Sequence, residues 1–124
     1  MMYTSQETFT FKGIACEYPD CHFEIARYQG TNNIYIGIID NEGPVCRCTV
    51  NISRSIPDDR IAIKDWSENE GMDVTLKEMN IIEGDPIDCE LSGFVTIDIY
   101  MLGEKGKQLV NEYLNELQKE GESK

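Results

Sequence analysis

The longest regular pattern in the sequence is an alternation between two sets of side chains over residues 91–102, and it constrains the fold more than any other feature. One set is apolar and consists of Val95, Ile97, Ile99 and Met101, while the other consists of Phe94, Thr96, Asp98 and Tyr100. A period of two residues is that of a β-strand, because successive side chains of a strand point to opposite faces of the sheet. The pattern therefore predicts one long, well-paired strand over residues 91–102.

Four shorter segments have the composition of strands, at residues 8–12, 22–28, 34–39 and 45–53. Turn-forming residues at 29–33 separate the second segment from the third, so these two are expected to form a hairpin. In the fourth, Cys46, Cys48, Val50 and Ile52 are expected to share one face, leaving Thr49 outside. Together with residues 91–102 these segments predict an antiparallel sheet of about five strands.

The period changes to that of a helix near the C-terminus. Apolar residues recur there at helical spacing: Leu109, Val110, Tyr113, Leu114 and Leu117. This stripe predicts a helix at about 104–119 that packs on one face of the sheet, against Val95, Ile97 and Ile99, because an apolar sheet face must be covered by another element.

Residues 56–90 lie between the fourth strand and the long one. A short acidic helix is expected at 65–71, with Asp65 as its N-cap and Gly71 at its end. Residues 74–82 fit either a helical turn or a strand, and Gly84, Asp85 and Pro86 are expected to break the chain. At 124 residues the chain fits one domain, 1–124. The sequence thus predicts an α+β domain with a short acidic helical insertion at about 56–90.

Acidic residues are concentrated in this same stretch. The chain has 23 Asp and Glu against 11 Lys and Arg, a net charge of −12. Residues 58–90 contain eleven of the acids: Asp58, Asp59, Asp65, Glu68, Glu70, Asp73, Glu78, Glu83, Asp85, Asp88 and Glu90. Such a field steers association with a basic partner and repels nucleic-acid phosphates and anionic membranes, although it can also serve solubility alone. The first nine are the candidate partner-binding residues.

Five cysteines and one histidine are the candidate reactive groups. Cys16, Cys21, Cys46 and Cys48 with His22 could supply a zinc site, but their spacing does not match the usual ligand pairs. A thiol nucleophile beside His22 is the other alternative, although neighbouring strand residues point to opposite faces. The odd cysteine count and the lack of an export signal in the sequence favour reduced thiols in the cytoplasm. We expect no metal, no cofactor and no catalytic residue.

Several short segments carry a resemblance to a known family. Residues Thr49-Val50-Asn51-Ile52, 61–71, Ser92-Gly93-Phe94-Val95 and Tyr100 resemble a family of small domain-of-unknown-function proteins of conjugative elements and phages. The resemblance covers roughly residues 44–102. The family pattern has a proline where this chain has Ser53, and a Tyr-Pro-Leu-Tyr motif where it has residues 97–100.

The resemblance implies a mobile-element context, in which small acidic proteins often inhibit host defence. The expected function is therefore a non-enzymatic, anti-CRISPR-like inhibitor that imitates nucleic acid and binds a basic host protein such as a CRISPR effector nuclease. It would bind neither nucleic acid nor a membrane directly. The alternative is a small adaptor or assembly protein of a phage or conjugative element. The sequence leaves the oligomeric state open.

Overall fold

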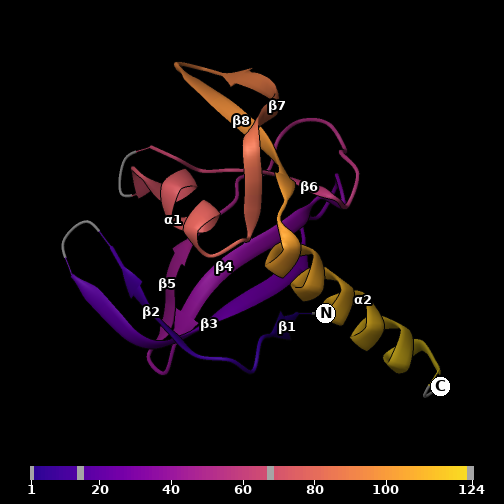
Figure 1. Ribbon diagram of the computed structural model, residues 1–124. Helices are drawn as coiled ribbons and strands as arrows, with labels where there is room; N and C mark the ends of the chain where they lie inside the picture. Colours follow the sequence, from indigo (N-terminus) through magenta and orange to yellow (C-terminus); the bar gives the residue numbers. More distant parts are fainter. Residues whose placement is uncertain (1, 14–15, 67–68, 123–124) are drawn as a thin grey trace.

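The computed structural model describes residues 2–13, 16–66 and 69–122 (Figure 1). In chain order the elements are β1 Tyr3–Thr4, β2 Phe9–Lys12, β3 Glu17–Arg27, β4 Ile34–Asp40, β5 Gly43–Arg47, β6 Arg60–Ala62, α1 Met72–Glu78, β7 Ile82–Ser92, β8 Val95–Leu102 and α2 Glu104–Glu122. The class is α+β, as predicted, and the C-terminal helix is confirmed.

Strands β1 to β5 form a five-stranded antiparallel sheet. β3 is its central strand: β1 and β2 pair with it at different positions, β4 pairs along its other side, and β5 pairs with β4. The β3–β4 hairpin follows the register in which Ile25 faces Ile36. The predicted antiparallel sheet of about five strands is therefore present, although it does not include residues 91–102.

The strand expected at 45–53 is shorter in the structure, since β5 ends at Arg47. Thr49, expected on the outward face, is buried beside the buried Cys48. Its hydroxyl accepts a hydrogen bond from the Ile36 amide at 3.2 Å and lies 3.1 Å from the Tyr28 hydroxyl. The chain thus leaves β4 at this point, and a side chain replaces a backbone carbonyl as the hydrogen-bond acceptor.

Residues 82–102 form a hairpin and not one strand over 91–102. β7 and β8 pair in antiparallel register from Asp88↔Ile99 to Ser92↔Val95, and β6 adds to the other side of β8. Gly93 has φ 63° while Phe94 does not share a positive φ, the pattern of a type II′ turn. Gly84 to Pro86, expected to break the chain, instead lies within β7 at an irregularity between Glu83 and Asp88.

Residues 56–90 therefore contain β6, α1 and most of β7. The helix expected at 65–71 is not confirmed as an α-helix: Asn69 is in a 3-10 turn, and the α-helix α1 spans Met72–Glu78 and begins at Gly71, which has φ 87°. Asp65 precedes α1 by several residues, and residues 67–68 of the expected helix lie outside the described chain. Val74 and the residues after it, left open between helix and strand, belong to α1 as far as Glu78.

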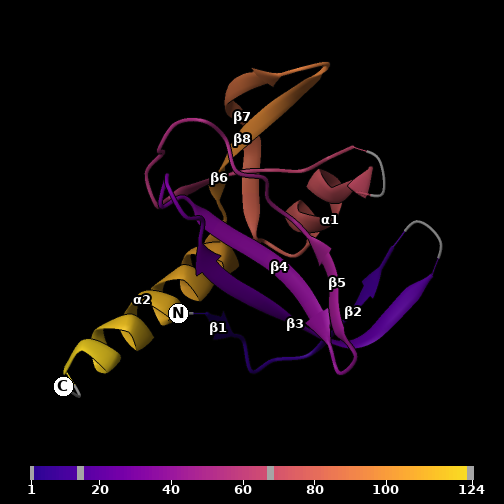
Figure 2. The same ribbon diagram turned by 180° about the vertical axis from the view of Figure 1, so that it is seen from behind.

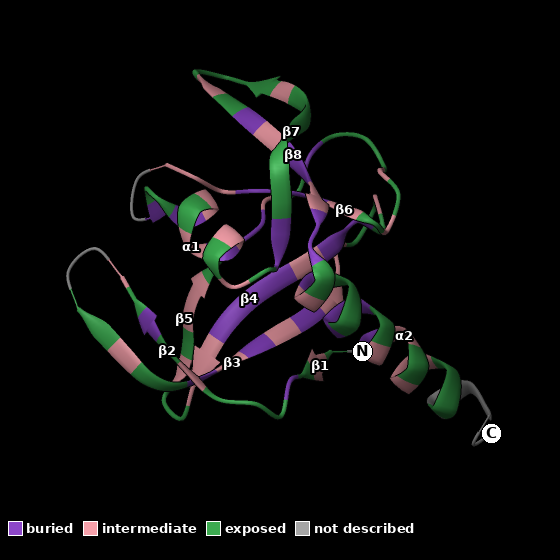
Figure 3. Ribbon diagram, in the orientation of Figure 1, coloured by how far each residue is buried: buried purple, intermediate pink, exposed green. Residues whose placement is uncertain are grey.

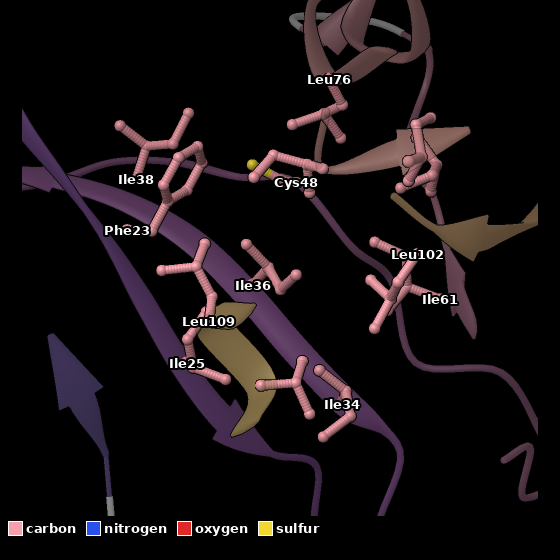
Figure 4. Packing of buried hydrophobic residues seen from close by; sticks show 14 of the residues in the cluster. Phe23, Ile25, Ile34, Ile36, Ile38, Cys48, Ile61, Leu76, Leu102 and Leu109 are labelled. Atoms are coloured by element: carbon pink, nitrogen blue, oxygen red, sulfur yellow. The ribbon is translucent and has the colours of Figure 1, made fainter. Parts of the chain in front are cut away.

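The main core lies where α1, α2 and β8 meet the five-stranded sheet (Figures 1 and 3). Figure 4 shows Ile25 and Ile36 of the sheet near Leu109 of α2, with Leu76 of α1 and Leu102 of β8 in the same cluster. Leu109, Val110 and Tyr113 are buried, whereas Leu114 and Leu117 are half-buried at its border.

The expected contact between α2 and Val95, Ile97 and Ile99 is wrong. Those three residues pack in a second, smaller core with Ile52 and Ala62, and half-buried Trp66 covers it. The alternation over residues 91–102 correctly gives an apolar face to β8, but the loop after β5 covers that face in place of α2.

Candidate interaction surface

The structure disperses the nine candidate acidic residues. Asp58, in the turn before β6, receives two hydrogen bonds of 2.9 Å from the Arg27 guanidinium of β3. Asp59 is paired with Arg60 at 2.9 Å, and this contact lowers its pKa. Glu83 lies 3.7 Å from the Lys107 ammonium of α2. These three carboxylates are neutralised within the molecule and contribute less to an external field than the sequence suggests.

Asp65 and Asp73 lie together beside Tyr100. One carboxylate oxygen of Asp65, Oδ1, is buried and has no hydrogen-bond donor within the described residues. Burial, and then the charge of Asp73, raises the pKa of Asp65, while the backbone amides of Asp73 and Gly71 act in the opposite direction. The Tyr100 hydroxyl approaches Asp73 Oδ2 at 3.5 Å. Burial and the nearby carboxylates raise the pKa of Tyr100 to about 12. Both residues are half-buried, and their carboxylates face one another and Tyr100.

Three of the nine remain exposed, with no cationic side chain paired to them in the described chain: Glu70, Glu78 and Asp85. Glu70 and Glu78 border α1, and Asp85 lies on β7. Glu68 lies outside the described residues. The acidic surface that the structure supports is therefore narrower than residues 58–90 and is centred on α1 and the β7–β8 hairpin.

The charged side chains of the β7–β8 hairpin are all acidic. Residues 82–102 include Glu83, Asp85, Asp88, Glu90 and Asp98 and no lysine or arginine. Arg54 reaches the hairpin from the loop after β5, with its guanidinium 2.7 Å from Asp88 and 3.2 Å from Glu90. Among the described residues, Arg54 and Lys107 are the two cations paired with these five carboxylates, which leaves an excess of three negative charges.

A buried amide holds the Arg54 loop in place. Asn33, in the turn between β3 and β4, donates to the Arg54 carbonyl at 2.9 Å and accepts from the Ile56 amide at 2.8 Å. Ser53 also donates to the Glu90 carboxylate, through its amide at 3.2 Å. The first sheet thereby fixes the loop that holds the hairpin.

The hairpin also exposes large apolar side chains. It extends from the body of the molecule in both views (Figures 1 and 2), and beyond its buried first residue β7 is exposed almost throughout (Figure 3). Ile87 is 46% exposed, Leu91 is 79% exposed, and Phe94 in the turn is fully exposed. Isolated exposed apolar residues are common, but three on one projecting hairpin are a candidate for contact with another protein.

Three of the five cysteines are buried or half-buried, whereas Cys16 and Cys89 are exposed. Cys21 and Cys48 are buried, Cys46 lies next to Cys48, and none of the five is in a disulfide. His22 Nδ1 lies 2.6 Å from the Ser5 carbonyl oxygen, so this nitrogen carries a proton and ties the segment after β1 to β3. Within the described residues no three His, Cys, Asp or Glu side chains are arranged to hold a metal.

A groove of about 370 Å³ lies between the N-terminal segment and α2. It is lined by polar and charged side chains, including Gln6, Glu7, Lys105 and Glu112. Glu7 and Lys105 form an ion pair at 2.6 Å across it.

No protein-family model, curated protein or solved structure matches this chain. The resemblance to a mobile-element family therefore stays a prediction. None of the helices in the described ranges combines the length and the apolar composition needed to cross a membrane.

Sequence reasoning missed Leu91 and Phe94 as candidate contact residues. It placed Phe94 in the middle of a strand, where one face would be covered. The dipeptide Ser92-Gly93 was the available signal, because Ser-Gly marks turns and glycine is the preferred first residue of a type II′ hairpin turn. A turn there puts Leu91 and Phe94 at the end of a projecting hairpin.

Proposed function

We propose that this protein is a non-enzymatic inhibitor that binds a basic, nucleic-acid-binding surface of a host defence protein in the bacterial cytoplasm. A CRISPR effector nuclease is the partner class we put forward, in keeping with the resemblance to proteins of mobile elements. The observation that carries the proposal is the excess of negative charge on the β7–β8 hairpin, next to the exposed Glu70 and Glu78 of the α1 region. A basic groove built for phosphates attracts such a surface.

The proposal assigns different roles to the acids of residues 58–90. Glu70, Glu78 and Asp85 are the partner-binding residues, since they are exposed and pair with no cation among the described residues. Asp58, Asp59 and Glu83 hold the fold through Arg27, Arg60 and Lys107. Asp65 and Asp73 face one another. A carboxylate that is already paired gains less from a second cation.

The experiment compares two triple variants with the same change of charge. The first is Glu70→Gln, Glu78→Gln and Asp85→Asn. The control is Glu17→Gln, Asp20→Asn and Glu42→Gln, three exposed acids of the first sheet. Association with purified CRISPR effector nucleases, and inhibition of their DNA cleavage, are measured between about 50 and 300 mM salt, where the Debye length falls from about 14 to 6 Å.

The first variant should associate more slowly and lose most of its salt dependence, while the control stays close to the original protein. Equal behaviour of the two variants would remove the local acidic surface from the proposal. Absence of binding to any effector nuclease would remove the partner class.

The second candidate is an adaptor or assembly protein whose charge serves solubility. The intramolecular pairing of Asp58, Asp59 and Glu83 favours it, because acids paired inside the molecule are less available to a partner. On this reading, neutralising Glu70, Glu78 and Asp85 lowers solubility and leaves the binding of partners unchanged.

A further inference from the structure

We propose that the free edge of β7 is a docking strand for an extended segment of a partner protein, and that this segment alternates apolar side chains with lysine or arginine. The inference rests on the proposed function in one respect, the basic character of the partner. It adds the mode of binding, strand addition to a sheet edge, and the residues that select the segment.

The first support is the position of β7 in its sheet. The strand order is β6-β8-β7, so β7 pairs with β8 on one side and is the edge of the sheet on the other. In the described parts of the chain no strand pairs with that edge. An open edge presents unpaired backbone N–H and C=O groups, which bind another extended chain through main-chain hydrogen bonds.

The second support is the division of β7 into two faces. Asp88 and Glu90 pair in register with Ile99 and Ile97, on the face that the Arg54 loop covers. By alternation Cys89 and Leu91 lie on the opposite face, where both are exposed, while the exposed Ile87 lies at the irregularity before Asp88. A strand added to this edge would place every second side chain beside the carboxylates and the others beside Leu91. That is the pattern of a segment in which basic and apolar residues alternate.

Phe94 extends the apolar face at the end of the hairpin. Its side chain is fully exposed in the turn after β7. Large aromatic side chains dominate the binding free energy of interfaces when they enter a pocket on the partner. Phe94 is therefore the expected anchor, and the main-chain pairing along β7 sets the orientation.

Asp88 hinders unwanted strand pairing at the edge of β7 in the free protein. Its carboxylate accepts a hydrogen bond from the Cys89 amide at 2.8 Å while it also binds Arg54. A charged residue on an edge strand is a common protection against unwanted pairing. A lysine of the docking segment can take up the Asp88 carboxylate and release the Cys89 amide to the incoming strand, so the same residue favours a basic segment over others.

Charge excludes the other occupants. Pairing of β7 with β7 of a second copy would bring Asp85, Asp88 and Glu90 against the same acids, and like charges on facing strands are destabilising. An anionic lipid surface would repel the hairpin for the same reason. A basic extended segment is the occupant whose charge complements this edge.

The test uses the full chain and short synthetic peptides. One peptide alternates valine with lysine, a second carries the same side chains but N-methyl groups on alternate amides, and a third alternates valine with glutamate. Their binding is measured by fluorescence anisotropy. The valine-lysine peptide should bind, and N-methylation should weaken binding at least roughly tenfold because it removes main-chain donors. The glutamate peptide should not bind.

The matched protein variant is Leu91→Ser with Phe94→Ser, which should keep the fold because both side chains are exposed. It should weaken binding of the valine-lysine peptide at least roughly tenfold. Control Val74→Ser changes an exposed apolar residue of α1 and should leave binding unchanged.

Equal binding of the N-methylated peptide would overturn the docking strand and leave the acidic surface of the proposed function intact. Unchanged binding by the Leu91→Ser, Phe94→Ser variant would overturn the role of the apolar face. Dimerisation in analytical ultracentrifugation, or attachment to phosphatidylserine vesicles, would also overturn the inference if either were lost with Phe94→Ser.

Discussion

The guanidinium of Arg27 and the carboxylate of Asp58 meet in two hydrogen bonds of 2.9 Å each. This fork joins the end of β3 to the turn before β6, and it raises the pKa of Arg27. A residue that the sequence marks as part of a binding surface thus connects the two sheets.

Asp58→Asn should destabilise the fold and leave partner association unchanged. The side chain of Asp58 is 43% exposed, so solvent screening limits the loss to roughly 0.5–1 kcal/mol. Urea unfolding measures the change, and Glu78→Gln, an exposed acid without a cation, is the control that should unfold as the original does. If Asp58→Asn slowed association as strongly as Asp85→Asn, Asp58 would belong to the binding surface.

The Asp65–Asp73 pair should contribute less to stability as pH rises through the acid range, opposite to Asp59 and Asp88, whose pKa values are lowered. The pKa of Asp65 is raised in the folded state, so the folded state holds its proton at pH values where the unfolded chain has lost it. Its contribution is therefore most favourable below the ordinary carboxyl pKa and is lost as pH rises through the raised one.

Asp65→Asn should remove the loss of stability that accompanies ionisation of Asp65. The asparagine oxygen still accepts from a backbone amide, and its NH₂ group can donate to Asp73, so stability at neutral pH should rise by about 1 kcal/mol. Asp65→Ala, which keeps neither bond, should not share the gain. Chemical unfolding between about pH 3.5 and 7 tests this. A stability difference between Asn and Asp that does not vary with pH would contradict the raised pKa.

The buried Thr49 hydroxyl predicts a difference between two conservative changes. Thr49→Val keeps the shape but leaves the Ile36 amide without its acceptor inside the core, which should cost about 1–3 kcal/mol. Thr49→Ser keeps the hydroxyl and loses one methyl group, at about 1 kcal/mol. Thermal unfolding of the two variants measures the difference in their stability. A more stable valine variant would show that the hydroxyl contributes no net stability.

Replacing glycine by alanine usually stabilises a helix, but at Gly106 we expect this substitution to destabilise the fold. A Cβ at this position of α2 would overlap the carbonyl oxygen of Ile81, while the Gly106 amide donates to Asn80 at 3.2 Å. Gly106→Ala should therefore cost about 1–3 kcal/mol from overpacking, against the gain of about 1 kcal/mol that helix propensity alone would give. Asn111→Ala, at an exposed position of the same helix, should stabilise slightly. If Gly106→Ala stabilised the protein as Asn111→Ala does, α2 would be able to shift away from residues 80–82.

Several elements follow from the sequence by local physics. The β3–β4 hairpin and α2 form where the pattern predicts them, although β3 begins at Glu17 and not at residue 22, because the period of apolar residues reports which side chains face a core. The stripe of α2 begins with Leu109, which is buried, and ends with Leu117, which is half-buried. The net charge and its concentration in residues 58–90 are likewise properties of the sequence.

The spacing of apolar residues predicts that a strand or helix has an apolar face, but the tertiary structure decided which element packs against that face. Val95, Ile97 and Ile99 do form an apolar face, but Ile52 and Trp66 cover it and α2 does not. Likewise, the burial of Thr49 depends on β5 ending at Arg47, after which the hydroxyl serves the Ile36 amide.

The candidate surface depends on tertiary structure for the same reason. Arg27 and Asp58 are 31 residues apart in the chain, and Arg54 and Asp88 are 34 apart, so no local pattern shows that these acids are neutralised. The strength of a charge interaction depends on distance and burial, which only the fold sets. The sequence alone determined that the protein is acidic, whereas the fold determined that Glu70, Glu78 and Asp85 remain exposed and that β7 ends beside Phe94 on an open edge.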